Sequence, residues 1–590
     1  MKTLKYIVPF LCVLGSTMSL MAEDSIVNRN ITVEREYKPV IQDAGKIKST
    51  PKILEPKVEK ITPTYSNFNL PLNADYNIHA LPAADLQRDK QAETNGGFAR
   101  LGIGNYLNTL ADFAYPLVKT SDIRLDFSLN HLGTFGTKAH STTKAALSFD
   151  KYFDNFDLYA GLGGGHEYLK YYGNDFNRND SIIDLAKLAA THGSNATYTE
   201  QNLNNIKRTA QSFKLSDLAN DSISNSNTFW RFNAFAGVRS LPTADELRYQ
   251  AEMQFKSFSA INGIVENQVH SKVGFNTQID DNRWGVDVEM YNMSYKSNIP
   301  ATLNYTDAYT VIGMNPYYSI ERPLYNVRLG LKSSISFVHG RAFSPSFDIR
   351  GEWKAIPKTL ALYGGITGAY AVNTMDEMFT ENRYLFADAR VEDTYTPSEV
   401  YVGIKLKPIQ NLLIDAFIHH SQIDNQYFFV NKGYTAATVM GADSMLYTNR
   451  FNVLYSGASH TQIGIRANYN LRNIVNVELK GAYNAWQVNS SQYAWNKPKW
   501  EADLNTNVQI TREFSVSANV YYERDRYAKL GSLAIPMNPK LDINLGASYS
   551  YNEWMTAFAK INNLINNKYQ DFYGYEVQGF NALVGVAFSF

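Results

Sequence analysis

The sequence predicts an all-β fold: one large antiparallel transmembrane β-barrel that runs from about Gly97 to Phe590. Segments of about ten residues alternate between apolar and polar side chains, as expected for strands with one face in lipid and the other in a polar lumen. The connections between these segments are short and long in turn. The final segment alternates in the same way and ends on the aromatic residue Phe590.

The first 22 residues have the layout of a secretory signal peptide. Two lysines precede an apolar stretch, and small residues precede the acidic start at Glu23. We expect cleavage after Ala22. The alternative, lipoprotein processing at Cys12, is disfavoured because Pro9–Leu11 lacks the small residues that such processing needs. Cys12 is the only cysteine, so the mature chain would contain no disulfide, thiolate metal site or cysteine nucleophile.

The composition favours strands over helices as the membrane-inserted elements. Aromatic residues make up 13% of the chain and charged residues only 19%. The mature sequence has no apolar run of about 20 residues, the length that a membrane-spanning helix requires. Basic and acidic residues are equal in number, 56 each, so no basic field indicates a nucleic-acid partner.

Alternation of period two recurs along the whole predicted barrel. In Ile123–Asn130 one face is wholly apolar and the other wholly polar, and Leu247–Lys256 and Trp500–Thr511 repeat the pattern. Counting these segments gives about 22 strands, within a range of roughly 20–24. The tenth strand, near Ala308–Ser319, is inferred mainly because without it the long connection Val372–Thr396 would fall on the rim of the short turns.

The connections alternate between two kinds. Short ones are predicted at Val118–Ser121, Asp154–Asn155, Leu241–Ala244, Asp280–Asn282, Ala355–Thr359, Pro408–Gln410, Arg472–Asn473, Arg512–Glu513 and Tyr551–Asn552. Longer polar ones are predicted at Lys170–Asn227, Val372–Thr396, Ser421–His460, Val488–Lys497, Asp525–Lys540 and Asn562–Gln578. Short turns on one rim and long loops on the other are typical of Gram-negative outer-membrane barrels, with the turns in the periplasm.

The last segment carries a further sign of membrane insertion. One face holds Phe580, Val584, Val586, Phe588 and Phe590, and it resembles the C-terminal signal by which barrel-assembly machinery recognises outer-membrane barrels. Aromatic residues near strand ends fit girdles at the two lipid–water interfaces. They are Tyr152, Phe153, Trp230, Trp284, Trp353, Trp500 and Trp554.

The segment Ala559–Tyr569, followed by Phe572–Tyr575 and Gly579–Phe590, resembles the end of a TonB-dependent receptor. In that family the penultimate strand runs into an N-L-x-N-x-x-Y motif, matched here by Asn563, Leu564, Asn566 and Tyr569, and the last strand ends in Phe. The resemblance implies a 22-stranded barrel with a folded plug inside it. The sequence departs from this pattern, because only Glu23–Gly96 precedes the first strand and it lacks the Gly-rich motifs of a plug.

The segment Glu23–Gly96 is predicted to be extended rather than compact, because its six prolines fix φ and interrupt ladders. Three placements stay open: threaded through the lumen as a reduced plug, paired with a periplasmic partner by strand addition, or disordered. Recurring apolar residues argue against full disorder. Ile31, Thr32 and Val33 loosely resemble a TonB box, the segment that contacts the TonB-type energising protein.

The sequence predicts no catalytic or metal site. His419 and His420 would point to opposite faces of a strand, so they cannot chelate one ion together. Asp280–Asn282 fits a turn rather than a calcium site, and the glycines in 161–165 fit close packing beside a large side chain. No candidate nucleophile has a candidate general base at a sequence separation typical of a known catalytic motif. We therefore expect neither an enzyme nor a bound cofactor.

The predicted lumen is lined by polar residues of both charges. Internal ion pairs in a hydrated lumen are the simplest interpretation of these residues, which include Arg124, Asp126, Arg248, Glu252, Lys256, Glu478, Lys480, Glu501 and Asp503. The loops Asn484–Trp495 and Gln426–Phe451 are rich in Tyr, Asn and Trp and would suit stacking on sugars or planar ligands.

Two functions from different classes follow. The first is a TonB-dependent-receptor-like transporter or receptor for a nutrient, in which the long loops capture a ligand that passes when the plug is displaced. The second is a structural or assembly barrel that docks periplasmic or outer-membrane proteins through residues 23–96 without active transport. An enzyme with its site on the rim is a third, weaker alternative. In every case outer-membrane lipid surrounds the barrel.

Overall fold

The computed structural model describes residues 96–173, 226–241, 247–261, 263–279, 282–297, 308–386, 389–435, 445–472, 474–531 and 533–590. The predicted signal peptide, segment 23–95 with Ile31–Val33, and most of the predicted loop Lys170–Asn227 lie outside these residues. The predicted turn residues Asp280 and Asp281 also lie outside them.

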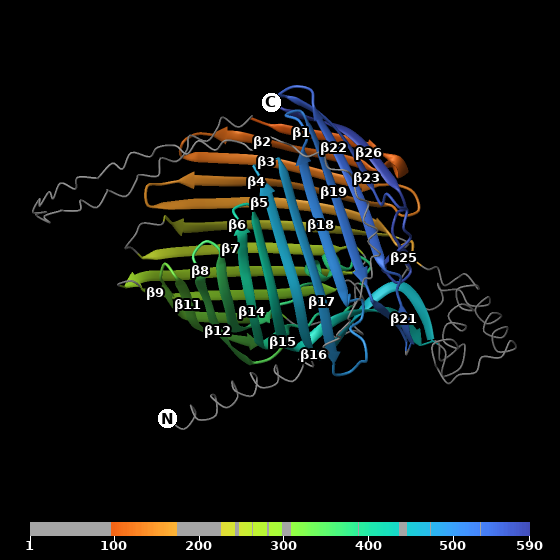
Figure 1. Ribbon diagram of the computed structural model, residues 1–590. Helices are drawn as coiled ribbons and strands as arrows, with labels where there is room; N and C mark the ends of the chain where they lie inside the picture. Colours follow the sequence, from red (N-terminus) through yellow and green to blue (C-terminus); the bar gives the residue numbers. More distant parts are fainter. Residues whose placement is uncertain are drawn as a thin grey trace, which may run out of the picture. The chain divides into compact units, whose positions relative to one another are not determined.

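Within these ranges, 22 strands form one antiparallel sheet that closes on itself (Figure 1). The first eleven are β1 (Phe98–Gly104), β2 (Thr109–Lys119), β3 (Ile123–Thr134), β4 (His140–Tyr152), β5 (Phe156–Lys170), β6 (Ser226–Ser240), β7 (Arg248–Ala260), β8 (Ile264–Ile279), β9 (Asn282–Ser297), β10 (Tyr309–Glu321) and β11 (Tyr325–Phe337). The others are β12 (Phe343–Ile356), β13 (Leu360–Ala371), β14 (Thr394–Ile409), β15 (Leu412–Thr435), β16 (Met445–Leu471), β17 (Val475–Val488), β18 (Trp500–Gln509), β19 (Phe514–Arg524), β22 (Lys540–Ser550), β23 (Met555–Asn562) and β26 (Asn581–Ser589).

Each strand of the barrel pairs with the next along the chain, and β26 pairs back to β1 in the register Phe98↔Ser589. Closure leaves no free sheet edge, which hydrocarbon would not tolerate. The predicted number of strands and the tenth strand, now β10, are confirmed. The backbone N–H of Phe590 donates to the carbonyl of Gly97 at 3.0 Å, so the first and last strands meet at the rim of short turns.

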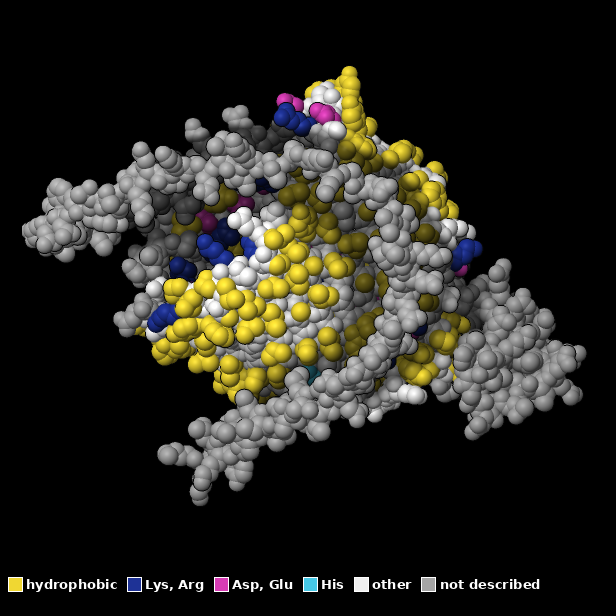
Figure 2. All heavy atoms as spheres, in the orientation of Figure 1, with side chains coloured by type: hydrophobic (Ala, Val, Ile, Leu, Met, Phe, Trp, Pro, Cys, Tyr) yellow, Lys and Arg dark blue, Asp and Glu magenta, His cyan; other side chains and the backbone are white. Residues whose placement is uncertain are grey.

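The outer face of the wall is apolar, as the alternation predicts. On β14 the side chains of Val400, Val402 and Ile404 are 43%, 57% and 48% exposed. On the other face of the same strand, Lys405 forms an ion pair with Glu352 of β12 at 2.7 Å. Figure 2 shows hydrophobic side chains spread over the wall of strands. No helix in the part of the chain that the structure describes is long and apolar enough to cross a membrane.

The inner face carries the predicted ion pairs. Arg124 pairs with Asp126 at 2.5 Å, and Lys480 pairs with Glu478 at 2.9 Å. The predicted close packing beside a large side chain is found at Gly161, where a Cβ would overlap the ring of Phe235, but not at Gly164 or Gly165. The two ion pairs lie within single strands, whereas the Gly161–Phe235 contact joins the neighbouring strands β5 and β6.

The two rims differ as predicted, with short turns on one (the turn rim) and longer connections on the other (the loop rim). The loop rim carries the helix α4 (Met375–Glu381), the 3₁₀ turn η2 (Asn105–Leu107) and the hairpins β20 (Tyr527–Leu530) with β21 (Leu533–Pro536) and β24 (Gln570–Phe572) with β25 (Tyr575–Glu576). The strands labelled β21 and β25 lie at one end of the barrel in Figure 1.

One predicted loop is wrong. Most of Ser421–His460, including the predicted ligand loop Gln426–Phe451, belongs to β15 and β16, which stay paired far beyond their neighbours, for example at Phe429↔Val453. Phe428 and Phe429 are adjacent, and both are buried because each face of this extension packs against a different cluster at the rim. A strand buried on both faces loses the period-two pattern and resembles a loop in sequence.

Candidate functional site

The loop rim is crossed by the connection between β13 and β14, residues 372–393, here named the cap. Its helix α4 begins after Thr374, whose side chain accepts a hydrogen bond from the amide of Glu377 at 3.1 Å, the usual way to satisfy a free amide at a helix start. Met375, Met378 and Phe379 point to one side and are 1% exposed or less. The cap is therefore a folded element that buries an apolar face.

The apolar face of the cap packs against walls on both sides of the barrel. The cluster includes Phe229 and Phe258 from β6 and β7, and Phe429 and Phe451 from β15 and β16. The ring of Phe379 lies 4.8 Å from that of Phe229 and 5.4 Å from that of Phe258. Since β6 and β16 are about half a circumference apart in a 22-stranded ring, one continuous core spans the mouth of the barrel.

Polar contacts fix the start of the cap helix to the barrel wall. Both carboxylate oxygens of Glu266 on β8 accept from helix amides, that of Met375 at 2.6 Å and that of Asp376 at 3.4 Å. Arg231 on β6 bridges Asp376 at 2.5 Å and Glu167 on β5 at 2.7 Å. Glu167 and Glu266 are buried and Arg231 and Asp376 are half-buried, so charge-assisted bonds are worth more here than on a surface.

A second polar cluster holds the end of the cap, where it enters β14. The carboxylate of Asp393 accepts from the hydroxyls of Tyr309 at 2.9 Å and Tyr370 at 2.8 Å. Burial raises the pKa of Asp393, although the two tyrosine hydrogen bonds act in the opposite direction. The hydroxyl of Tyr455 accepts from the amide of Glu392 at 2.8 Å, which ties this end of the cap to β16. The cap is thus anchored at both ends and through its core.

Beside the cap lies a cavity of about 520 Å³, here named the mouth cavity. Its walls come from the ends of β3, β5, β15 and β19, the C-terminal end of α4 and the β24–β25 hairpin. Its charged lining comprises the basic residues Lys138, Lys170, Arg383, Lys497, Arg526 and Lys540 and the acidic residues Glu381, Glu501, Glu523 and Asp571. The lining therefore has more positive than negative groups.

Most of these basic groups have acidic partners. Lys497 pairs with Glu381 at 2.9 Å, and Lys540 lies between Glu523 at 3.2 Å and Asp571 at 3.1 Å. Arg526 pairs with Glu523 at 3.2 Å, and its guanidinium also donates to two backbone carbonyls of the β24–β25 hairpin. Burial lowers the pKa of Arg526, against the acidic neighbours that act to raise it.

The three other basic groups of the cavity have no close ion pair with a described residue. Lys138 has a weak ion pair with Glu576 at 3.8 Å, and burial lowers the pKa of its amine. Among the residues that the structure describes, Lys170 and Arg383 make no side-chain hydrogen bond or ion pair. The excess positive charge of the mouth cavity is thus carried by Lys170 on the barrel wall and Arg383 on the cap.

Aromatic rings complete the cavity. Tyr384 stacks on Tyr575 with ring centroids 3.4 Å apart, and Tyr172 meets the same ring edge-on at 5.1 Å. Phe572 and Trp495 also line the cavity. Trp495 belongs to the segment Asn484–Trp495 and Phe429 to the segment Gln426–Phe451, the two segments that the sequence suggested for stacking on a ligand. The arrangement offers flat apolar surface next to uncompensated positive charge.

The histidine pair lies as predicted. His419 faces the lumen and approaches Glu399 at 3.1 Å, whereas His420 on the opposite face bonds to the hydroxyl of Thr461 at 2.8 Å. Among the described histidines and acidic residues, no group of three is arranged to hold a metal ion.

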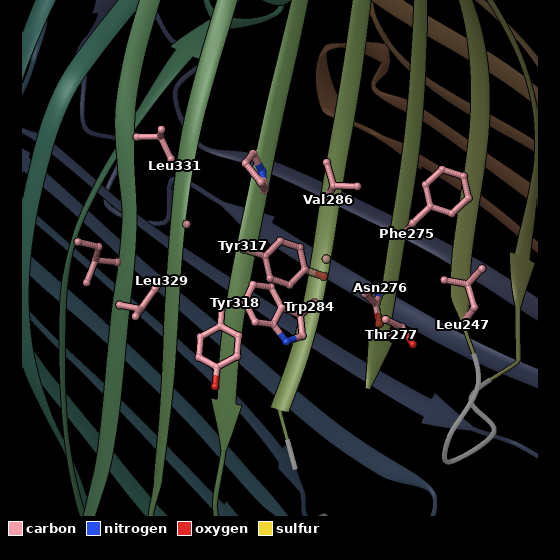
Figure 3. A pocket seen from close by; sticks show the side chains of 14 residues that line it. Leu247, Phe275, Asn276, Thr277, Trp284, Val286, Tyr317, Tyr318, Leu329 and Leu331 are labelled. Atoms are coloured by element: carbon pink, nitrogen blue, oxygen red, sulfur yellow. The ribbon is translucent and has the colours of Figure 1, made fainter. Parts of the chain in front are cut away.

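A second large pocket, of about 730 Å³, is a groove on the apolar outer wall over β8 to β12 (Figure 3). Trp284 and Tyr318 lie side by side in it, with ring centroids 4.6 Å apart, near the turn rim. Trp284 is 52% exposed, which fits its predicted place in an aromatic girdle. Because this groove faces the hydrocarbon side, it belongs to the lipid contact rather than to the lumen.

The predicted motif residues at the end of the chain build a turn. Asn563 and Asn566 have φ of 50° and 52°, a backbone region in which asparagine is favoured among residues with a side chain. The side chain of Asn563 donates to the carbonyls of Asn567 at 2.8 Å and Gln578 at 3.1 Å, and Tyr569 donates to Asp542 at 2.9 Å. Leu564 is 39% exposed. These side chains shape the base of the β24–β25 connection.

The residues of the predicted insertion signal lie on and beside β26. Val584 and Phe590 are 58% and 55% exposed, and Phe580 also faces outwards. Phe588 stacks on Trp554 with centroids 6.0 Å apart, while Val586 is half-buried opposite Leu101. The ring of Phe590 stacks on Tyr115 at 6.1 Å.

No family model matches the sequence, and no curated protein is significantly similar to it. Solved structures match the fold at low sequence identity. The siderophore receptor PirA from Acinetobacter baumannii gives a TM-score of 0.59 at 10% identity, covering 85% of this chain and 81% of that one. The ferric-catecholate import receptor Fiu from E. coli K12 gives 0.58 at 12%, covering 85% and 82%.

A third match is the copper transporter OprC, with a TM-score of 0.56 at 13% identity over 84% of this chain and 80% of that one. The proteins in these three structures are described as receptors and transporters, not as enzymes. At such identities the likeness concerns the fold alone. Together with the apolar outer wall and the two unequal rims, it establishes that this chain is an outer-membrane barrel with the 22-stranded fold of the TonB-dependent receptors.

Proposed function

We propose that this chain is an outer-membrane receptor and transporter that captures a nutrient ligand in the mouth cavity and admits it to the lumen when the cap moves. The observation that carries the proposal is the cap itself, a folded element anchored across the loop rim beside a cavity large enough for a small molecule. A purely structural barrel needs no such cavity behind a closed mouth.

Energy for passage would come from a TonB-type protein acting on the segment before the barrel, with Ile31, Thr32 and Val33 as its contact. This part of the proposal rests on the sequence. It is tested by capture of the full chain on the periplasmic domain of the energising protein, with deletion of residues 31–33 as the control. Capture that the deletion abolishes supports energised uptake, whereas failure to capture the full chain removes it.

The role of the cap can be tested directly, because Ala371 and Thr394 are paired neighbours in the β13–β14 hairpin. A short Gly-Ser turn can therefore replace residues 372–393 without separating the strands. We expect the full chain to be closed in planar bilayers, and the variant without the cap to conduct once residues 23–95 are also deleted. A steady large conductance of the full chain, unchanged by removal of the cap, would contradict a gate at this rim.

The alternative is that residues 23–96 dock a partner protein and the barrel transports nothing. Deletion of residues 23–95 from the otherwise intact protein separates the two. The transporter proposal expects the deletion to abolish accumulation of the ligand in whole cells, whereas the docking alternative expects it to abolish co-purification of a partner and leave permeability unchanged. A related fold does engage a protein: the receptor FpvAI is solved in complex with pyocin S2.

A further inference from the structure

We infer that the mouth cavity selects an anionic small molecule that carries a flat apolar ring. The inference rests on the proposed function and names the chemical class of its ligand. Lys170 on the barrel wall and Arg383 on the cap would bind the negative groups, and the rings of Tyr172, Tyr384 and Phe572 would cover the flat part.

The charge of the lining supports an anion over a neutral or cationic ligand. Lys497, Arg526 and Lys540 are compensated within the cavity by Glu381, Glu523 and Asp571, at distances of 2.9 to 3.2 Å. Glu501, the remaining acid, accepts from the side chain of Asn484 at 3.1 Å. A half-buried cation without an acidic partner loses part of its hydration and gains no ion pair in return. An anionic ligand would supply the missing partner.

Glu167 lies outside the lining but close enough for Arg383 to act on its charge, although it forms no ion pair with Arg383. Its two oxygens contact His140 at 3.0 Å and Arg231 at 2.7 Å, so it serves the anchor of the cap. Arg383 lines the cavity, and no hydrogen bond from its guanidinium to a described residue occupies its donors. A planar guanidinium of this kind suits two parallel hydrogen bonds to a carboxylate, phosphate or sulfonate group.

The volume and the aromatic walls of the cavity limit the size and shape of the ligand. A volume of about 520 Å³ lies within the range of small-molecule sites and is too small for a folded protein domain. Tyr384 is held rigidly by its stack on Tyr575, so it presents a fixed flat surface. Because Arg383 precedes Tyr384 on the cap, a ligand bound there would also connect the cap to the wall residue Lys170.

The test uses the full-length protein in a neutral detergent and follows fluorescence anisotropy of hydroxypyrene trisulfonate, a flat aromatic trianion. Methylumbelliferyl glucoside serves as the neutral ring of comparable size. We expect saturable binding of the trianion that weakens with added salt, and at least tenfold weaker binding of the neutral probe. Lys170→Gln and Arg383→Gln should each weaken trianion binding about tenfold or more, because each removes a charge-assisted contact.

Three controls make the result specific. Lys407→Gln removes a positive charge near the turn rim and should leave binding unchanged. Arg383→Lys keeps the charge but not the planar fork, and should recover part of the affinity. The trianion should also slow hydrogen exchange in residues 375–386 of the cap, which adventitious binding elsewhere would not do. All variants are checked for the heat-modifiable gel mobility of a folded barrel.

Each outcome is decisive. Equal affinity for the neutral probe, or trianion binding that neither Lys170→Gln nor Arg383→Gln weakens, would overturn the anionic class. So would the absence of any trianion binding to a folded protein. None of these results affects the conductance test of the cap, so the inference can fail while the proposed function stands. If removal of the cap never opens the barrel, the proposed function fails whatever the probe does.

Discussion

Phe379→Ala should release the cap while leaving the barrel intact. Phe379 is 1% exposed and packs between Phe229 and Phe258 in the core that spans the mouth. Truncation of a fully buried phenylalanine costs about 3–5 kcal/mol, because the apolar transfer term and the unfilled volume add. The barrel strands do not depend on this side chain, so the loss falls on the docking of the cap.

The size of the effect can be read from hydrogen exchange of the cap amides. The amide of Met378 donates to Thr374 at 3.1 Å and that of Asn382 donates to Met378 at 2.8 Å, so both exchange only when α4 opens. Since about 1.4 kcal/mol is a factor of ten, a loss of 3–5 kcal/mol should speed their exchange by roughly a hundredfold to a few thousandfold. The measurement is mass spectrometry of peptides from residues 372–386 of the detergent-solubilised protein.

A matched control separates this effect from general damage. Phe347 on β12 is 54% exposed on the outer wall, and Phe347→Ala should leave exchange of the cap unchanged. The reasoning is refuted if Phe379→Ala gives a folded, heat-modifiable barrel whose cap amides exchange at the original rate. In that case the buried aromatic core would not be what holds the cap down.

Three further predictions concern the wall, the charge anchor and assembly. Gly285→Ala would place a Cβ in the ring of Tyr317 and should destabilise the barrel by about 1–3 kcal/mol in guanidinium unfolding from lipid vesicles. Arg231→Met leaves the carboxylate of Asp376 without its cation, and should loosen the cap by about 1–3 kcal/mol in hydrogen exchange. Deletion of Phe590 should lower the fraction of heat-modifiable protein in membranes several-fold, if its side chain is the predicted insertion signal.

Each of these predictions has a conservative partner. Gly313→Ala should be tolerated, because the nearest atom to its Cβ would be the hydroxyl of Ser334 at 3.5 Å, an ordinary contact. Lys407→Gln should leave cap exchange unchanged where Arg231→Met speeds it. Phe590→Tyr keeps a terminal aromatic ring and should assemble normally. Equal behaviour of the members of any pair would contradict the corresponding argument.

The barrel could be predicted from sequence because its physical constraint is local and repeated. Each lipid-spanning strand must alternate apolar and polar side chains. Because short and long connections must also take turns along the chain, even β10, whose own pattern is weak, could be predicted. The extension of β15 and β16 above their neighbours could not be predicted in the same way. There Phe428 and Phe429 are both buried by packing at the rim, and the alternation that marks a strand disappears.

The site was harder to predict than the fold for a different reason. Cap residues such as Phe379 and Arg383 lie in a segment predicted only as a loop, Val372–Thr396, and α4 has too few residues to show a helical period. Their partners come from distant strands, and which side chains meet at the mouth depends on where each strand ends. Only the aromatic composition of the loops indicated this rim, and the two segments it singled out contain Phe429 and Trp495 of the lining but none of its charged residues.

A wall of 22 strands encloses a wide lumen, which forms an open pore unless some segment of the protein fills it. The structure answers this for one rim: the inward-folded segment is the cap, and its core reaches from Phe229 to Phe451 across the mouth. In the proposed transporter, closure from this side and capture of a ligand involve the same residues, because Arg383 and Tyr384 belong to the cap and also line the cavity. A ligand that contacts these two residues would change the free energy of cap opening by the difference between its affinities for the closed and the open state, which is the physical basis that we propose for coupling recognition to passage.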